Sequence, residues 1–96
     1  VKIIIKRRVQ PDKEAELLPL LNKLRSNAID VSGYISGETL RSMDQPDMFL
    51  VISTWHSSGD WKKWIASEDR KKIQDKIDAL LGGETEYEMF HYGFSE

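Results

Sequence analysis

The sequence predicts an α+β domain of the ferredoxin-like type, with elements in the order β-α-β-β-α-β. Four segments have the apolar and β-branched character of strands, and two amphipathic segments with helical spacing lie between the first two strands and between the last two. In this order the strands form a four-stranded antiparallel sheet with the helices on one face. The chain has 96 residues and no linker-like stretch, so residues 1–96 are expected to form a single domain.

The first strand is predicted over residues 2–9, which include three consecutive isoleucines and end before Pro11. A helix is expected to follow from Asp12, a residue type favoured as an N-cap, to about Ile29. Apolar residues recur on one face of this segment. Pro19 lies inside it and should kink the helix or delay its regular start, because proline lacks a backbone N–H.

A turn at Gly33 leads into a second strand over residues 34–43. Gly37 lies inside this strand, where glycine indicates a bulge or a close approach of the backbone. The segment Asp-Gln-Pro-Asp at 44–47 has strong turn character, and the third strand follows over residues 48–55. The second and third strands therefore form a hairpin.

The second helical region is predicted in two parts. A short helix opens at residues 57–60 and runs to about Ala66, and Ser67 is expected to cap a new helix that ends at residues 82–83, both glycine. This new helix carries a continuous apolar stripe, typical of a helix that packs on a sheet. The last strand is predicted over residues 84–94.

The first and third strands are apolar on both faces, as the segments Ile3–Ile5 and Met48–Ile52 show. An antiparallel sheet with one solvated face should instead alternate apolar and polar residues. A chain of this length has no further element to cover the second face. We therefore expect a homodimer that forms sheet to sheet, which gives a dimeric α/β-barrel.

Composition excludes several functional classes. Fourteen Lys and Arg against sixteen Asp and Glu give a net charge of −2, which argues against a nucleic-acid partner. The apolar runs are far shorter than the roughly 20 residues needed to cross a membrane, and the N-terminus does not have the pattern of a secretory signal. The absence of cysteine excludes disulfides, thiolate metal clusters and a cysteine nucleophile. These features favour a cytoplasmic protein.

Three segments resemble the antibiotic biosynthesis monooxygenase (ABM) superfamily: Gly33–Glu38 (Gly-Tyr-Ile-Ser-Gly-Glu), the strand end Ser53–Trp55 and the helix Trp61–Ser67. The resemblance covers the whole chain in element order. It implies a dimer through the sheets and a ligand cleft between the helices and the sheet of each subunit. Known activities of this superfamily include the cofactor-independent oxidation of aromatic polyketides and the degradation of haem.

The haem-degrading members of this superfamily use an Asn on the first strand, a Trp on the helix after the third strand and a His about ten residues later. At the corresponding positions this chain has Arg7, Trp64 and Gln74. Two of the three residues differ, and an axial nitrogen ligand for iron is absent at that place. Haem degradation therefore ranks below the other activities, and no cofactor is expected. Other branches often carry His in the segment that corresponds to residues 67–76, where this chain has none.

The tryptophans are the first candidates for a binding site. Trp61 and Trp64 lie on one face of the short helix and can form a wall on which a flat ring stacks; the alternative is that both are core residues. Trp64 is the better candidate, because periodicity and resemblance agree there. Trp55 is expected to end its strand and pack in the core. We take Trp61, Trp64 and Tyr34 as the candidate substrate-binding residues.

Arg7 and His91 join Trp64 as the candidate catalytic residues. By pleat alternation Arg7 shares a face with Ile3 and Ile5. Its guanidinium can hold an anion there, and the alternative is a solvated charge at the end of the strand. Arg8 is expected to be solvated. His91 can accept a proton near neutral pH, and its strand can turn it toward the cleft or toward the dimer face. His56 is expected in a solvated loop.

Two further residue sets receive a structural interpretation. Tyr34 and Tyr87 could each donate a hydrogen bond to a quinone oxygen, but a tyrosine at a strand start or at the dimer face is more often structural. Basic residues of the second helical region are interleaved with acidic ones and are expected on a solvated helix surface; they are Lys62, Lys63, Arg70, Lys71, Lys72 and Lys76. With two His and no Cys, no metal site is expected.

The sequence thus predicts a protein similar to ABM monooxygenases, which oxidises a small aromatic or quinone-like molecule with O₂ and without a cofactor. The alternative is a dimeric domain that binds a small ligand without catalysis, and haem degradation is a third possibility. Fold alone does not decide between them.

Overall fold

A computed structural model describes residues 1–83 and 85–93 of the chain. The elements follow in the predicted order, with the second helical region divided in two. They are β1 (Lys2–Arg8), a short 3-10 helix (Pro11–Lys13), α1 (Glu14–Ile29), β2 (Tyr34–Arg41), β3 (Met48–Trp55), α2 (Ser58–Ile65), α3 (Glu68–Leu81) and β4 (Glu86–Phe90).

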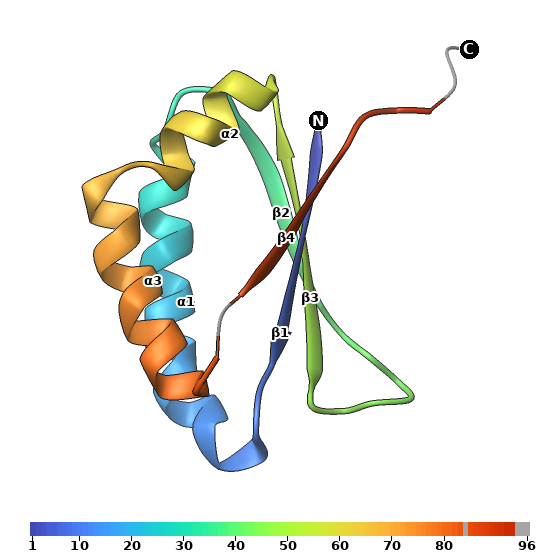
Figure 1. Ribbon diagram of the computed structural model, residues 1–96, viewed down its shortest axis with the longest axis vertical. Helices are drawn as coiled ribbons and strands as arrows, with labels where there is room; N and C mark the ends of the chain where they lie inside the picture. Colours follow the sequence, from blue (N-terminus) through green and yellow to red (C-terminus); the bar gives the residue numbers. More distant parts are fainter. Residues whose placement is uncertain (84, 94–96) are drawn as a thin grey trace.

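The four strands form one antiparallel sheet in the order β2-β3-β1-β4. Figure 1 shows α1 and α3 side by side on one face of this sheet, with α2 near one end of the strands. The predicted ferredoxin-like α+β class is confirmed. Among the described helices, none combines the length and the apolar character that crossing a membrane requires.

Several predicted element ends are wrong, and one of them is the end of β2, which lies at Arg41 and not at residue 43. Asp12 does not cap α1, because Pro11 opens a separate 3-10 turn and the α-helix begins only at Glu14. Regular α-helix thus starts later than predicted, and Pro19 is accommodated inside it. The last strand is shorter than predicted, since β4 covers Glu86–Phe90, and Tyr92 beyond it is 81% exposed. Residues 84 and 94 of the predicted strand lie outside the described residues.

The caps of the second helical region agree with the sequence. The Ser57 side chain accepts a hydrogen bond from the Asp60 N–H at 3.1 Å at the start of α2, and Ser67 accepts one from the Arg70 N–H at 3.2 Å at the start of α3. Gly82 ends α3 with a φ of +71°, a left-handed conformation that glycine adopts without strain. The two serine caps fix where α2 and α3 begin, and so help to set the direction of Trp61 and of Arg70.

The irregularity predicted at Gly37 has two parts. The register of β2 and β3 shifts between Tyr34 and Ser36, so the bulge lies before Gly37. At Gly37 itself, a Cβ would lie only 2.8 Å from the Tyr34 hydroxyl oxygen. Glycine at this position therefore leaves room for the Tyr34 side chain over the inner face of the strand.

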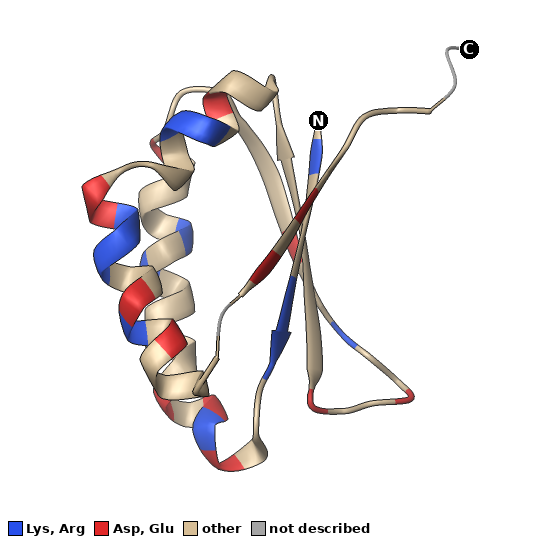
Figure 2. Ribbon diagram, in the orientation of Figure 1, with Lys and Arg blue, Asp and Glu red and all other residues tan. Residues whose placement is uncertain are grey.

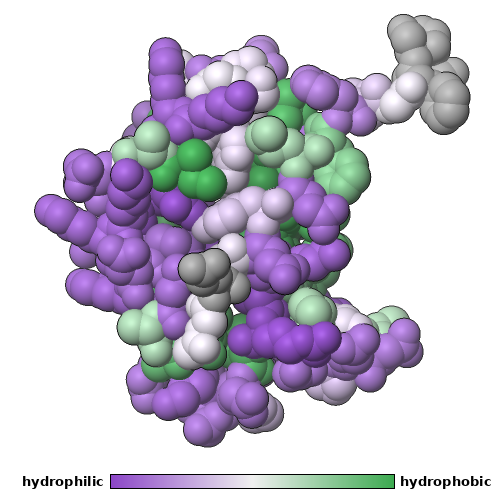
Figure 3. All heavy atoms as spheres, in the orientation of Figure 1, coloured by the Kyte–Doolittle hydropathy of each residue, from purple (hydrophilic) through white to green (hydrophobic). Residues whose placement is uncertain are grey.

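The core between helices and sheet has two clusters of buried apolar residues. The first contains the three tryptophans with Ile3, Ile5 and Ala28, and the second contains Val9, Leu17, Ile73 and Ile77. Figure 2 shows acidic and basic residues alternating along α3, and Figure 3 shows hydrophilic atoms gathered over the helical side of the molecule. The helices thus turn apolar stripes inward and most of their charges outward, as their periodicity predicts, with Arg70 on α3 as a buried exception.

The sheet face turned away from the helices has an apolar centre. Ile4 pairs with Ile52 across β1 and β3, and Leu50 lies on the same face; all three are half-buried in the single chain. Leu40 on β2 and Phe90 on β4 extend this patch and are 46% and 47% exposed. No described helix covers this face, in agreement with the apolar pattern of both central strands.

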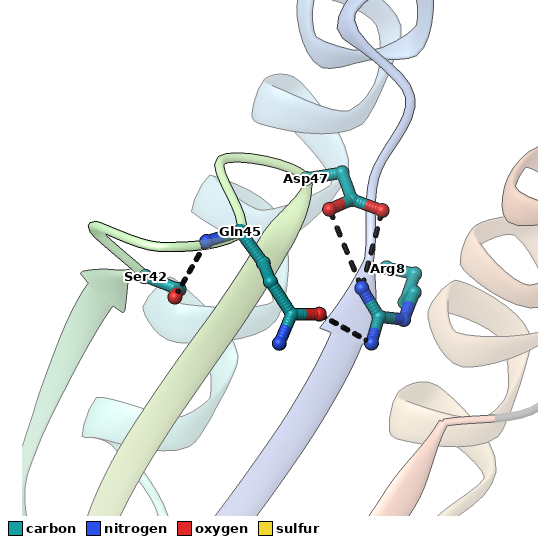
Figure 4. A network of polar contacts seen from close by, with 4 residues as sticks. All are labelled: Arg8, Ser42, Gln45 and Asp47. Carbon is teal, nitrogen blue, oxygen red and sulfur yellow. Dashed lines mark hydrogen bonds and ion pairs between the residues drawn. The ribbon is translucent and has the colours of Figure 1, made fainter.

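Side-chain hydrogen bonds join the hairpin between β2 and β3 to the end of β1. Arg8 donates to the Asp47 carboxylate, with both N–O distances at 3.3 Å, and to Gln45 Oε1 at 2.8 Å (Figure 4). The Gln45 N–H donates in turn to Ser42 Oγ at 3.0 Å. Arg8 is exposed, so its expected place in solvent is confirmed.

Candidate ligand cleft

A cleft with a volume of about 600 Å³ lies between the helices and the inner face of the sheet. Most of its lining is apolar or aromatic. The residues of this kind include Leu21, Leu24, Tyr34, Phe49, Val51, Trp55, Trp61 and Trp64. This volume and this lining are typical of sites for small organic molecules.

The cleft opens between α1 and β2. Its exposed lining residues lie on these two elements, and Leu18 on α1 is 59% exposed. Arg25 on α1 donates a hydrogen bond to Thr39 Oγ1 on β2 at 3.1 Å across this opening. An ion pair of 2.6 Å between Arg41 and Glu14 joins the end of β2 to the start of α1. Polar contacts at the rim therefore hold the two sides of the opening together.

One end of the cleft is aromatic and is built around Trp55. This side chain is 1% exposed, and its Nε1 donates to Ser53 Oγ at 2.7 Å, so its polar atom is satisfied. Its ring centroid lies 5.4 Å from Tyr34 and 5.8 Å from Trp61 in edge-to-face geometry, and 6.4 Å from Trp64 in a stacked arrangement. These distances lie in the favourable range for aromatic pairs.

Trp61 and Trp64 are core residues and wall residues at the same time. They lie three residues apart on capped α2, so both point toward the sheet, and they are 4% and 7% exposed. Both also line the cleft. The two interpretations that the sequence left open are therefore compatible, since both residues are buried in the core and both border the cavity.

The other end of the cleft is polar and contains two buried arginines, Arg7 on β1 and Arg70 on α3, each 6% exposed. Both donate to one acceptor, Gln74 Oε1, at 3.4 Å and 3.3 Å. Arg70 also donates to the Tyr87 hydroxyl oxygen, and its guanidinium carbon lies 5.1 Å from the centre of the Tyr87 ring. Arg7, Arg70 and Tyr87 all line the cavity.

Burial changes the acid–base properties of this end. Desolvation lowers the pKa of Arg7 from its ordinary value, and the nearby positive charge of Arg70 acts in the same direction. Burial raises the pKa of Tyr87, more than the two arginines lower it. Tyr87 therefore remains a neutral hydroxyl at physiological pH. Because its oxygen already accepts from Arg70, its own hydrogen is available for a further acceptor.

The structure brings four of the predicted site residues to this one cleft: Arg7, Tyr34, Trp61 and Trp64. Trp55, expected only to end its strand and pack, is buried and also lines the cleft. His91 is not brought there, since it follows the end of β4, is exposed and does not line the cavity. His56 is exposed in the turn after β3, as expected for a solvated histidine.

The sequence predicts other roles for two residues of the polar end, Arg70 and Tyr87. Arg70 was expected on the solvated surface of the second helical region, and this is wrong because the residue is buried. Its spacing of three and seven residues before Ile73 and Ile77 places it on the apolar stripe of α3, which is the signal that identifies it. Tyr87 pairs with Ile5 and so faces the helices, which depends on strand register.

The polar end is built from guanidinium, carboxamide and hydroxyl groups. No group of three or more His, Cys, Asp or Glu residues that could hold a metal ion occurs in the part of the chain that the structure describes. The amide nitrogen of Gln74 donates to Asp78 Oδ1 and Thr85 Oγ1, each at 2.8 Å, and its Oε1 accepts from both arginines. Its carboxamide is thus fully engaged inside the protein.

Comparison with known proteins supports the architecture. A sequence model of the family described as antibiotic biosynthesis monooxygenase matches residues 1–76. Among curated proteins, SchA of Streptomyces halstedii is 22% identical over 83 residues; the match covers 86% of this chain and 22% of SchA. The chain thus spans only about a fifth of that relative.

Solved structures share the fold at low sequence identity. A conserved protein from Methanosarcina mazei Go1 superposes with a TM-score of 0.84 at 22% identity, covering 94% of this chain and 89% of that chain. SnoaB from Streptomyces nogalater, a cofactor-independent oxygenase, superposes with a TM-score of 0.83 at 15% identity, covering 98% of this chain and 93% of its own. The matches extend over nearly all of the described chain.

Proposed function

Because the chain belongs to the antibiotic biosynthesis monooxygenase family, we propose that its cleft binds a small, flat aromatic or quinone-like molecule and oxidises it with O₂ without a prosthetic group. One observation carries this proposal: Trp61 and Trp64, on one capped helix, border a mostly apolar cavity of about 600 Å³. Indole rings that line such a cavity favour flat ring systems through stacking. SnoaB, with the same fold, is a cofactor-independent oxygenase.

The reaction requires only the substrate and O₂. A ring carbon that bears two hydrogens next to a conjugated carbonyl loses one proton, and the resulting carbanion transfers an electron to O₂. Recombination forms a C–O bond, and loss of water from the hydroperoxide leaves a new carbonyl. One oxygen atom enters the substrate and the other leaves as water, while the substrate supplies all the electrons.

The cleft supports this reaction by favouring the ionised substrate. Two buried guanidinium groups at the polar end lower the pKa of an acidic group bound beside them, because opposite charge stabilises the ionised form. The tryptophan wall excludes water from the ring and so strengthens these electrostatic interactions. Tyr34, which also lines the cleft, supplies a hydroxyl for a carbonyl oxygen.

Oxygen uptake tests this proposal. With a panel of anthrone-like substrates, which carry such a ring carbon, the protein should consume O₂ and form the carbonyl product, and Trp64→Leu should reduce the rate at least about tenfold through loss of ring stacking. Far-UV circular dichroism and thermal melting verify that the variant is folded. The control is Met43→Ala in the hairpin, where the side chain is 98% exposed. Absence of uptake over such a panel by the folded protein contradicts the proposal.

A non-catalytic binding domain is the second candidate, and one observation favours it. At the polar end of the cleft, the described lining residues include no carboxylate or imidazole that could remove a proton. In this case the same aromatic molecules should bind and quench tryptophan fluorescence in a Trp64-dependent manner, but O₂ uptake should not exceed the buffer rate.

We further infer that the working unit is a homodimer that forms through the open sheet faces, which gives the dimeric α/β-barrel expected from the sequence. The half-buried side chains of Ile4, Leu50 and Ile52 support this inference, since a second copy would bury them fully. Light scattering should give twice the 11.1 kDa mass of one chain, and Ile52→Lys should halve that mass. A monomer at micromolar concentration contradicts the dimer.

A further inference from the structure

The polar end of the cleft has an unusual balance of charge. Arg7 and Arg70 are both more than nine-tenths buried, yet neither forms an ion pair with a carboxylate among the described residues. Their one common acceptor is the neutral amide oxygen of Gln74. Buried charges are usually paired, because removing a charge from water without a partner is costly.

The hydrogen-bonding capacity of this end is also incomplete. The Nε of Arg7 is buried and has no hydrogen-bond partner among the described residues. The Tyr87 hydroxyl accepts from Arg70 and keeps its own hydrogen for another acceptor. Arg70 is better satisfied, since it donates to Ile65 O, Gln74 Oε1 and the Tyr87 hydroxyl oxygen. Because Arg7, Arg70 and Tyr87 all line the same cavity, an acceptor bound at this end would lie beside two guanidinium groups and one hydroxyl.

The Asp78 carboxylate does not act as the acceptor for these donors. Among the described residues Asp78 forms no ion pair with either arginine, although its charge acts on Arg7 over a longer distance. Its Oδ1 instead accepts a hydrogen bond from the Gln74 amide at 2.8 Å. Asp78 Oδ1 also accepts from Thr85 Oγ1 at 3.1 Å. Asp78 and Thr85 thus hold the Gln74 side chain in place, so that its oxygen faces both guanidinium groups.

We infer that Arg7, Arg70 and Tyr87 form an anion subsite, and that the ligand of this cleft is a flat conjugated molecule with an anionic oxygen on its ring system. This oxygen belongs to a carboxylate or to an ionised hydroxyl, and both provide the negative charge and lone pairs that the free donors require. The inference rests on the proposed function insofar as it takes this cleft as the ligand site. It adds the chemical class of the ligand.

The arrangement of the two ends decides how such a ligand lies. The tryptophan wall contacts the ring faces, while the anionic oxygen points toward β1 and α3, where the arginines lie. Tyr87 connects both ends, because its ring lies 5.6 Å from that of Trp61 and its hydroxyl contacts Arg70. A neutral aromatic molecule can use the wall but leaves the two buried positive charges without a partner.

Matched pairs of ligands test this inference. The first pair is 2-naphthoate and the uncharged naphthalene-2-carboxamide; the second is 2-hydroxy-1,4-naphthoquinone, ionised at neutral pH, and 1,4-naphthoquinone. Binding is followed by calorimetry and by quenching of tryptophan fluorescence. In the unmodified protein, the anion of at least one pair should bind ten or more times tighter than its neutral partner. The pair with the larger ratio identifies the carboxylate or the ionised hydroxyl as the preferred group.

Substitutions of the two arginines test whether the preference for anions depends on the proposed subsite. Arg7→Met and Arg70→Met should each reduce the anion preference to within about threefold of unity, because each removes a buried guanidinium and leaves the tryptophan wall intact. Arg8→Met is the matched control, since it removes the same charge from the next residue of β1, where the side chain is exposed and bonded to Asp47. It should leave the ratio unchanged. Arg7→Gln provides a second variant if either Met variant fails to fold.

The outcomes separate this inference from the proposed oxidation. Equal binding of anions and neutral partners, or an equal loss of preference in Arg8→Met, overturns the anion subsite even if O₂ uptake is observed. Anion preference that depends on Arg7 without O₂ uptake supports the subsite and contradicts the oxidation. Failure of all four ligands to bind overturns both.

Discussion

The two ends of the cleft are built on opposite principles. At the aromatic end, Trp55 has its indole N–H satisfied by Ser53 and its ring in contact with three other aromatic rings. At the polar end, Arg7 is equally well buried but lacks a carboxylate partner among the described residues, and its Nε is unsatisfied. The aromatic end therefore stabilises the fold. At the polar end a buried donor, Arg7 Nε, has no partner among the described residues, and unsatisfied polar groups of this kind are typical of binding sites.

Arg8, the neighbour of Arg7 in the sequence, provides a second comparison. Arg8 is one residue further along β1, on the opposite side of the strand, and forms an exposed ion pair with Asp47 at 3.3 Å (Figure 4). Pleat alternation thus gives two adjacent arginines opposite environments. The comparison shows that the burial of Arg7 is decided by the face of the strand on which it lies.

The largest effect is expected at the aromatic end. Trp55→Ala should lower the free energy of unfolding by about 3–5 kcal/mol, because it removes a fully buried ring and leaves a cavity. Urea unfolding followed by circular dichroism measures this change. Met43→Ala, at a position 98% exposed, should change stability by less than about 0.5 kcal/mol. A loss below about 1 kcal/mol in Trp55→Ala would show that the cluster does not support the fold as described.

A smaller effect with the opposite sign is expected at the polar end. Arg7→Met should leave the free energy of unfolding unchanged or raise it by up to about 2 kcal/mol, because it replaces an unpaired buried charge by an apolar side chain. The same urea titration measures it. Arg8→Met should lose no more than about 1 kcal/mol, as is usual for an exposed ion pair. Marked destabilisation by Arg7→Met would assign Arg7 to the support of the fold and not to a ligand.

The smallest effect concerns alkaline stability. The folded state raises the pKa of Tyr87 above its ordinary value of 10.0, mainly through burial. The stabilisation linked to the neutral hydroxyl is thus complete below about pH 10 and is lost as pH rises from there through the raised pKa. In Tyr87→Phe, the free energy of unfolding should fall less steeply above pH 10. Identical slopes for the two proteins would contradict the burial of this hydroxyl.

The sequence predicts much of the fold because the relevant interactions are local. Periodicity places Trp61 and Trp64 together on one helix face, Ser67 and Gly82 mark the ends of α3, and pleat alternation places Arg7 on the same strand face as Ile3 and Ile5. Predictions of this kind are wrong where another local conformation is more stable. Pro11 starts a 3-10 turn that takes Asp12 away from the cap position of α1.

By itself, then, the sequence determined the class of the fold, the uncovered apolar face of the sheet and the aromatic wall, since each follows from residues a few positions apart. The tertiary structure alone decided that Arg7, Arg70 and Tyr87 meet at one end of the cleft. These residues come from β1, α3 and β4, and β1 pairs with β4 in a register that sets Tyr87 beside Ile5. Their convergence depends on strand register and helix packing over long sequence separations, which residue types and spacing do not encode.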